Sequence, residues 1–130
     1  MKHTLAALAA LGLSIGAAYA DDVTGVWKTE ANDEGNYLEV DFAPCGDAMC
    51  GTIVAARNVS GSSDENYEHL GKPMVTGMVP DGKNEWTDGE IWDPSEDKRY
   101  DSNMELKGDT LVVEGCILFF CRGQDWTRVN

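Results

Sequence analysis

The sequence has little positive charge. Its 130 residues include 10 Lys and Arg against 23 Asp and Glu, so the formal net charge is −13 at pH 7. Binding to nucleic acid requires clustered Lys and Arg that contact phosphates, and docking on anionic lipid requires the same kind of cluster. The excess of acidic residues therefore argues against a nucleic-acid partner and against electrostatic attachment to anionic lipid.

Long apolar segments are also lacking. Residues 1–20 have the layout of a secretory signal peptide, with Lys2 first, an apolar run over 5–18, and a small-residue cleavage site ending at Ala20. The run is shorter than the ~20 residues of a membrane span, which disfavours a retained anchor. We expect cleavage after Ala20, one domain over residues 21–130, a periplasmic or secreted location, and no stable membrane insertion.

Histidine is almost absent. His3 lies in the expected leader, so His69 is the one candidate for acid–base chemistry near neutral pH. It lies in a Gly- and Ser-rich loop beside Glu68, with Ser60 and Ser62 nearby in the sequence. A Ser–His–acid triad needs a geometry that such a loop rarely supplies. We therefore expect an exposed loop histidine, assign no catalytic residue, and predict that the protein is not an enzyme.

Acidic residues are too frequent to identify a site by themselves. Pairs such as Asp33-Glu34 recur along the chain, so a glycosidase pair cannot be singled out. Residues 81–85 and 93–97 form acidic loops with oxygen ligands that suit calcium, but neither matches the helix–loop–helix calcium motif. We assign no metal-binding and no cofactor-binding residue and leave calcium in these two loops open.

Four cysteines form two pairs with the same spacing: Cys45 with Cys50, and Cys116 with Cys121. An even number in a small exported domain indicates disulfides. A four-thiolate zinc site is less favoured, because zinc-binding pairs usually lie closer in the sequence. Three pairings are possible by count, and we favour Cys45–Cys50 and Cys116–Cys121, because a hairpin end brings facing Cβ atoms within reach of a disulfide.

Short alternating segments separated by turn residues run through the rest of the chain, and no stretch has a helical period over three turns. This pattern predicts an all-β sandwich or closed barrel of about eight strands, and a closed barrel leaves no exposed edge. Gly89 suggests a bulge, and Gly115 suggests a break between strands. The expected strands are 26–29, 37–42, 52–56, 74–79, 86–92, 99–106, 110–114 and 124–129.

The first and last expected strands carry a suggestive pair of motifs, Gly25-Val26-Trp27 and Trp126-Thr127-Arg128. The first and last strands are neighbours in a closed antiparallel barrel, so an Arg guanidinium on one can lie over a Trp ring on the other. This looks like the calycin arrangement of lipocalin-like barrels. We expect Gly25, Trp27, Trp126 and Arg128 to close the barrel.

Further motifs extend the similarity over nearly the whole chain after the leader. Together they resemble the bacterial exported family catalogued as domain of unknown function 2147. The resemblance implies a single antiparallel up-and-down, lipocalin-like β-barrel and no assigned reaction. The motifs are, in order, Gly25-Val26-Trp27, Cys45-Gly46-Asp47-Ala48-Met49-Cys50-Gly51-Thr52-Ile53-Val54, Gly71-Lys72-Pro73, Trp86-Thr87-Asp88-Gly89-Glu90-Ile91-Trp92-Asp93-Pro94, Tyr100, and Gly115-Cys116 followed by Cys121-Arg122-Gly123-Gln124-Asp125-Trp126-Thr127-Arg128.

Two departures from the family pattern stand out. Asp97 precedes Lys98 at a turn position where the family usually has glycine, and Asp tolerates a left-handed backbone there at modest cost. The segment 58–79 is shorter and less regular than in the family. This difference affects the shape of one barrel end.

Aromatic and methionine side chains are the candidates for lining a ligand cavity, and we select Trp86, Trp92, Phe42 and Met74. An eight-stranded barrel is just wide enough to fill itself with side chains or to hold one small ligand. The apolar run 117–120 lies between two cysteines. We expect it to plug one barrel end, with an exposed patch for a partner or lipid as the alternative.

These features predict a non-enzymatic protein of the bacterial cell envelope that binds a small apolar ligand. The alternative is a structural or interaction protein with a filled barrel core, which docks on an envelope protein through its rim or through residues 117–120. The ligand prediction depends on analogy with the fold.

Overall fold

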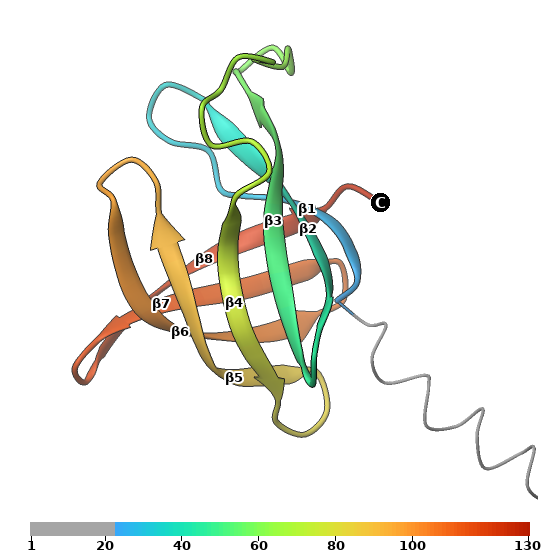
Figure 1. The fold of residues 1–130 in the computed structure, drawn as a ribbon, viewed down its shortest axis with the longest axis vertical. Helices are drawn as coiled ribbons and strands as arrows, with labels where there is room; N and C mark the ends of the chain where they lie inside the picture. Colours follow the sequence, from blue (N-terminus) through green and yellow to red (C-terminus); the bar gives the residue numbers. More distant parts are fainter. Residues whose placement is uncertain (1–22) are drawn as a thin grey trace, which may run out of the picture.

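The structure is a computed structural model that describes residues 23–130, which form one closed antiparallel barrel of eight strands (Figure 1). Each strand pairs with the next along the chain, and β1 pairs with β8. The predicted all-β, up-and-down barrel is confirmed. The expected leader and its cleavage site lie outside the described residues. The strands are β1 Gly25–Lys28, β2 Tyr37–Cys45, β3 Ala48–Arg57, β4 Pro73–Pro80, β5 Glu85–Asp93, β6 Lys98–Lys107, β7 Thr110–Ile117 and β8 Phe120–Arg128.

The up-and-down order places alternate connections at opposite ends of the barrel. The β1–β2, β3–β4, β5–β6 and β7–β8 connections share one end, which we call the mouth end. The other three connections, the start of β1 and the end of β8 share the opposite end, which we call the closed end. The long β3–β4 connection rises above the strands at the top of Figure 1.

The closed end is sealed by contacts between β1 and β8. Trp27 pairs in register with Arg128, whose guanidinium carbon lies 4.3 Å from the Trp27 ring centroid. Nη1 of Arg128 donates a hydrogen bond to the backbone oxygen of Thr24 over 3.1 Å. A cation over an aromatic face is stabilising, and more so when both groups are partly desolvated. The barrel therefore closes around this pair.

Gly25 is required at the same junction. Its φ of +121° is a left-handed conformation that side chains rarely adopt, and a Cβ there would lie 2.5 Å from the backbone oxygen of Asn130. Asn130 itself accepts a backbone hydrogen bond from Val26. Trp126 lies two residues before Arg128 on the same face of β8 and is 1% exposed.

Alternation along the strands produces a compact core in the half of the barrel near the closed end. Burying these side chains removes apolar surface from water, which is the main favourable term in folding. The largest fully buried side chains are Trp27, Trp126, Phe42, Ile53, Met78, Leu111, Val23, Val40 and Val75.

Gly115 differs from its predicted role. It does not end a strand, because β7 continues through it to Ile117 and β8 already begins at Phe120. Gly115 pairs with Arg122, and a Cβ on it would meet Tyr100 and Ile91 only at ordinary contact distance, 3.5 Å or more. The absent side chain widens the barrel here without interrupting the ladder.

Gly89 behaves as predicted. The register between β5 and β6 shifts between Trp86 and Gly89, and the intervening Asp88 has a φ of 64°. This is a bulge of the kind that bends one strand relative to its partner.

Both favoured disulfides are present, which removes the free thiolates that the zinc alternative needed. Cys116 lies directly opposite Cys121 across the β7–β8 ladder. Cys45 instead pairs with Ala48, so its bridge to Cys50 runs diagonally. Two disulfides in a domain of this size are typical of an oxidising, extracytoplasmic environment.

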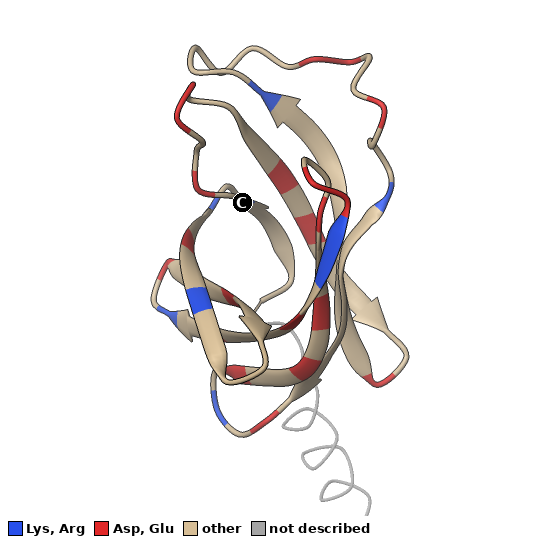
Figure 2. Ribbon diagram, turned by 90° about the vertical axis from the view of Figure 1, so that its left-hand side faces the viewer, with Lys and Arg blue, Asp and Glu red and all other residues tan. Residues whose placement is uncertain are grey.

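Acidic positions are spread over strands and loops around the barrel, whereas basic positions are few and separated (Figure 2). This arrangement agrees with the net charge of −13. Within residues 23–130 there is no helix of the length and hydropathy needed to cross a bilayer.

Candidate functional site

A cavity of about 1140 Å³ opens at the mouth end of the barrel. Its walls come from the mouth-end halves of β2 to β8, and from the β1–β2, β3–β4 and β5–β6 connections. Ligand pockets usually measure roughly 300–1,000 Å³. Because this cavity runs out to the exposed rim, a ligand would occupy its inner part.

The inner wall is apolar. Val113 and Trp126 are almost fully buried beneath it, while Ile91, Leu38 and Met74 are half-buried along its sides. An apolar concave surface of this kind favours the apolar part of a small molecule, because burial removes that part from water.

Most of the polar lining of the cavity comes from the connections and the end of β5, which contribute the carboxylates of Glu30, Asp64, Glu68, Asp93 and Glu96, and inward positions of β8 add Arg122 and Gln124. Arg122, Gln124 and Trp126 alternate along the strand, and all three line it. Gln124 is already engaged, because its Oε1 accepts a hydrogen bond of 2.8 Å from Nε1 of Trp126. Arg122 is exposed to the cavity opening and forms no ion pair with a carboxylate of residues 23–130.

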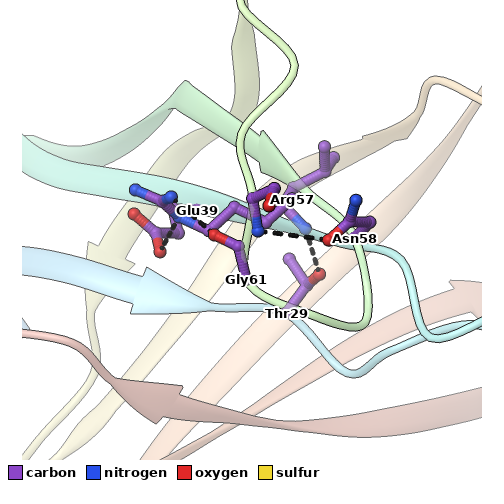
Figure 3. Close-up of polar contacts among 7 residues, drawn as sticks. Thr29, Glu39, Arg57, Asn58 and Gly61 are labelled. Carbon is purple, nitrogen blue, oxygen red and sulfur yellow. Dashed lines mark hydrogen bonds and ion pairs between the residues drawn. The ribbon is translucent and has the colours of Figure 1, made fainter.

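A second arginine at the rim is already paired (Figure 3). Nε of Arg57 donates to Oε2 of Glu39 over 2.7 Å, and Nη1 donates to the backbone oxygen of Gly61 over 3.0 Å. The hydrogen bond that Arg57 donates to Glu39, followed by the negative charge of Glu39, raises the pKa of Arg57 above its ordinary value. Arg57 thus ties the β3–β4 connection to the barrel, whereas Arg122 has no such partner.

The β3–β4 connection is ordered by local hydrogen bonds, despite its polar composition. The Asn58 side-chain oxygen accepts hydrogen bonds from the backbone nitrogens of Ser60 and Ser62, and from the Ser60 hydroxyl. This is the side-chain-to-backbone pattern that Asn contributes to turns. Farther along, the backbone nitrogen of Asp64 donates to Ala56 on β3. The connection therefore forms a fixed wall of the mouth.

His69 is not an exposed loop histidine, so that expectation is wrong. Its side chain is only 18% exposed and packs edge-on between the rings of Tyr67 and Trp92, with centroids 5.3 and 4.9 Å away. Aromatic pairs prefer this T-shaped arrangement. The ring stack docks the β3–β4 connection against β5, which sequence spacing alone did not reveal.

Tyr67 continues this stack at the cavity wall. Burial raises the pKa of Tyr67 above its ordinary value, with smaller contributions from the charges of Glu68 and Asp93. The phenol therefore stays protonated at neutral pH.

The four side chains selected as candidate ligand-lining residues divide into two pairs. Trp92 and Met74 line the cavity. Phe42 and Trp86 do not, because they pack into the core and are 0% and 5% exposed. The alternation of side chains along a strand identified apolar positions. Whether such a side chain lines the cavity or packs in the core depends on how far along the barrel axis it lies.

Residues 117–120 do not plug the barrel, so this expectation is also wrong. Ile117 and Phe120 lie at the cavity rim, while Leu118 and Phe119 project outward and are 89% and 103% exposed. The hairpin extends β7 and β8 straight past the disulfide, so its turn cannot fold back over the opening.

In the acidic loop 93–97, the carboxylates of Asp93 and Asp97 accept hydrogen bonds from neighbouring groups of the protein. Oδ1 of Asp93 accepts hydrogen bonds from the backbone nitrogen and the hydroxyl of Ser95, and Oδ1 of Asp97 accepts one from Nε1 of Trp92. Asp97 has a φ of 53°, as its place in a glycine position predicts. The one metal-like grouping within residues 23–130 is Glu114 with Cys116 and Cys121, and both cysteines are oxidised.

Arg122, Gln124 and Tyr100 are cavity residues that sequence reasoning missed. The expected last strand began at residue 124, so the inward position of Arg122 fell outside it. Counting back in steps of two from Trp126 would have found Arg122, because side chains alternate between the two faces of a strand.

Comparisons with known proteins agree with the fold. The protein HP1028 from Helicobacter pylori, described as belonging to the lipocalin family, has a similar structure with a TM-score of 0.67. The two chains share 13% identity, and the match covers 84% of each, so the likeness shows the fold alone. The comparison with curated proteins finds no match. Residues 25–128 match the profile of the family described as "Uncharacterized protein conserved in bacteria (DUF2147)", and the chain belongs to this family.

Proposed function

We propose that this protein binds one small amphipathic molecule in the mouth-end cavity, with the apolar part against the inner wall and an anionic group at Arg122. The observation that carries the proposal is a cavity with an apolar inner wall, whose entrance holds a guanidinium without a carboxylate partner among residues 23–130. An arginine in such a place can bind a carboxylate or phosphate through two parallel hydrogen bonds.

The same cavity favours binding over the alternative of a filled barrel that acts only through its surface. A filled core would leave no volume at this level, whereas Gly115 and the half-buried Ile91 leave one open. We also propose that the protein is not an enzyme. Within residues 23–130 no serine hydroxyl is hydrogen-bonded to the imidazole of His69, whose Nδ1 instead lies 3.1 Å from Nζ of Lys72, so this histidine has no nucleophile to activate.

The place of action that we propose is the periplasm or the extracellular space. This is supported by the two disulfides, by the leader-like residues 1–20, and by membership of a bacterial family. Mass spectrometry of the exported protein tests this directly. We expect a chain that begins at Asp21 and is lighter by the four hydrogens lost to two disulfides.

Binding is tested with two dyes that share a ring system. The dye 1-anilinonaphthalene-8-sulfonate carries a sulfonate, and N-phenyl-1-naphthylamine does not. We expect both to fluoresce on binding, and Gly115→Leu to abolish both signals, because the new side chain enters the cavity. Gly123→Leu is the matched control. Gly123 pairs with Glu114 on the outer face of the same ladder and does not line the cavity.

A substitution at Arg122 should affect binding of only one of the two dyes. We expect Arg122→Gln to lower the affinity for the sulfonate dye about tenfold, which is the effect of losing one charge-assisted hydrogen bond. The affinity for the neutral dye should change by less than about twofold. Equal loss of both dyes would show that Arg122 shapes the cavity without recognising an anion. Full binding to Gly115→Leu would place the dyes outside the cavity and refute the proposed site.

A further inference from the structure

The β7–β8 hairpin ends in an exposed apolar tip, which we define as residues 117–120. Their exposed fractions are 59%, 89%, 103% and 69%, so all four side chains face solvent. Contiguous exposed apolar groups are uncommon on soluble proteins and mark interaction surfaces. We propose that this tip inserts into the surface of a zwitterionic phospholipid bilayer and holds the cavity mouth against the lipid.

The backbone of the tip shows that its apolar turn has a local energetic cost. Leu118 has a φ of 56°, in the left-handed region where hairpin turns normally have glycine or asparagine. Gly46 has the corresponding place in the other disulfide-bonded hairpin, with a φ of 69°. A leucine here strains the turn, which is explained if its side chain has a role outside the fold.

The shape of the tip fits a lipid surface better than a protein surface. It is a narrow projection that ends at Leu118 and Phe119, two residues beyond the Cys116–Cys121 bridge. At ~3.3 Å per residue the tip reaches roughly 7 Å past the bridge, and apolar faces at the bilayer boundary penetrate roughly 5–10 Å. A stable protein interface instead needs a broad area of about 800 Å² on each partner.

The charges along the hairpin and the net charge of the chain favour zwitterionic over anionic lipid. Between Glu114 and Asp125 the chain has no acidic residue and one basic residue, Arg122. A single guanidinium can meet a lipid phosphate, but the net charge of −13 repels a strongly anionic surface. We therefore infer binding to zwitterionic lipid that anionic lipid weakens.

The tip is continuous with the cavity, because Ile117 and Phe120 belong to both. With the tip in the bilayer, an amphipathic molecule of the proposed kind would pass between lipid and cavity without crossing open water. The inference goes beyond the proposed ligand binding and can be tested separately from it.

The experiment uses the exported protein, checked by mass to begin at Asp21, and vesicles of phosphatidylcholine. All four native tryptophans are at most 7% exposed, so a Phe119→Trp substitution provides a reporter at the tip. We expect its emission to shift to shorter wavelength on vesicles and to be quenched by lipids brominated near the headgroup boundary. An unchanged emission would overturn the proposal.

Two variants test the side chain itself. We expect Phe119→Ser to weaken vesicle binding at least about tenfold, the effect of withdrawing one buried phenyl group from lipid. Val59→Ser is the matched control, because Val59 is 79% exposed on the β3–β4 connection, outside the tip. It should bind like the wild type. Equal binding by Phe119→Ser and wild type would also overturn the proposal.

Further controls distinguish the remaining outcomes. Gly115→Leu should bind vesicles normally even though it closes the cavity, so a failure of ligand binding does not count as a failure of lipid binding. Replacing part of the lipid with phosphatidylglycerol should weaken binding at low salt. If the wild type ignores vesicles and sediments as a dimer that Phe119→Ser dissociates, the tip is a contact between copies and the lipid proposal is wrong.

Discussion

The two disulfide-bonded hairpins have the same cysteine spacing but opposite surroundings. Cys45–Cys50 brackets the polar turn Gly46-Asp47 at the closed end, whereas Cys116–Cys121 brackets an apolar turn at the mouth end. The first hairpin follows the usual rule that glycine supplies the left-handed residue, and the second places a leucine there. The turn at the closed end is therefore unstrained, whereas the turn at the mouth end is strained at the residues that we propose bind lipid.

The same contrast separates the two halves of the barrel interior. Near the closed end, a Cβ on Gly51 would lie 2.7 Å from a methyl carbon of Val40 and 3.1 Å from the Phe42 ring. At the mouth end, a Cβ on Gly115 would have nothing closer than 3.5 Å. Gly51 therefore lies in close-packed surroundings, whereas Gly115 borders the cavity.

The largest effect is expected at the closed end, from Arg128→Ala. This change removes the cation over Trp27 and the hydrogen bond to Thr24, and we expect it to lower the free energy of unfolding by about 2–3 kcal/mol in urea titrations. Arg122→Ala, on the same strand at the mouth end, should change it by less than about 0.5 kcal/mol. Similar losses for both arginines would remove the distinction between the two ends.

A second comparison uses the two interior glycines. Gly51→Ala should destabilise the protein by about 1–3 kcal/mol, because its methyl group has to displace Val40 and Phe42 from a packed core. Gly115→Ala should be nearly neutral in the same urea titration, since its methyl group enters free space. A costly Gly115→Ala would mean that the mouth end is packed after all.

The hairpin turns allow a reciprocal exchange. Leu118→Gly should raise the free energy of unfolding by about 1 kcal/mol, because glycine relieves the left-handed strain. Gly46→Leu should lower it by about the same amount, since a side chain there meets no atom within 4 Å and adds only strain. If Leu118→Gly instead destabilises the protein, the leucine contributes to folding, and the argument from strain is lost.

The smallest effect concerns pH at the mouth. Because burial raises the pKa of Tyr67 above its ordinary value of 10.0, the unfolded chain loses this proton at lower pH than the folded chain. The associated stability is fully present below about pH 10 and decreases as pH rises through the folded pKa. Tyr67→Phe should lack this decrease, and hydrogen exchange should locate it in residues 58–72. A decrease of equal size in the variant would assign it to other groups.

Much of the fold followed from local sequence pattern. Short segments bounded by turn residues located the eight strands approximately, although β3 begins at Ala48 and β8 at Phe120, four residues before the expected starts. The motifs around Trp27 and Arg128 identified the junction that closes the barrel, and the structure places the guanidinium over the ring. Such features depend on neighbours along the chain or on strand order, and both can be read from one sequence.

The candidate site was harder to predict. Alternation indicated that Phe42, Trp86, Trp92 and Met74 are apolar positions, but it could not show at which level of the barrel each lies. His69 was expected to be exposed because its loop is polar, yet Tyr67 and Trp92 enclose it. These contacts join residues from different elements, so they depend on how the connections pack.

By itself, the sequence determined the acidic composition and an all-β chain of about eight short strands, because charge and periodicity are local properties. It favoured a closed barrel through the family resemblance and one cysteine pairing through hairpin geometry, and the structure decided both. Only the tertiary structure decided that the barrel is hollow at one end, that Arg122 faces the opening without a carboxylate partner among residues 23–130, and that residues 117–120 project from the rim. The physical reason is that unfilled volume and exposure arise from the sum of many side chains in three dimensions.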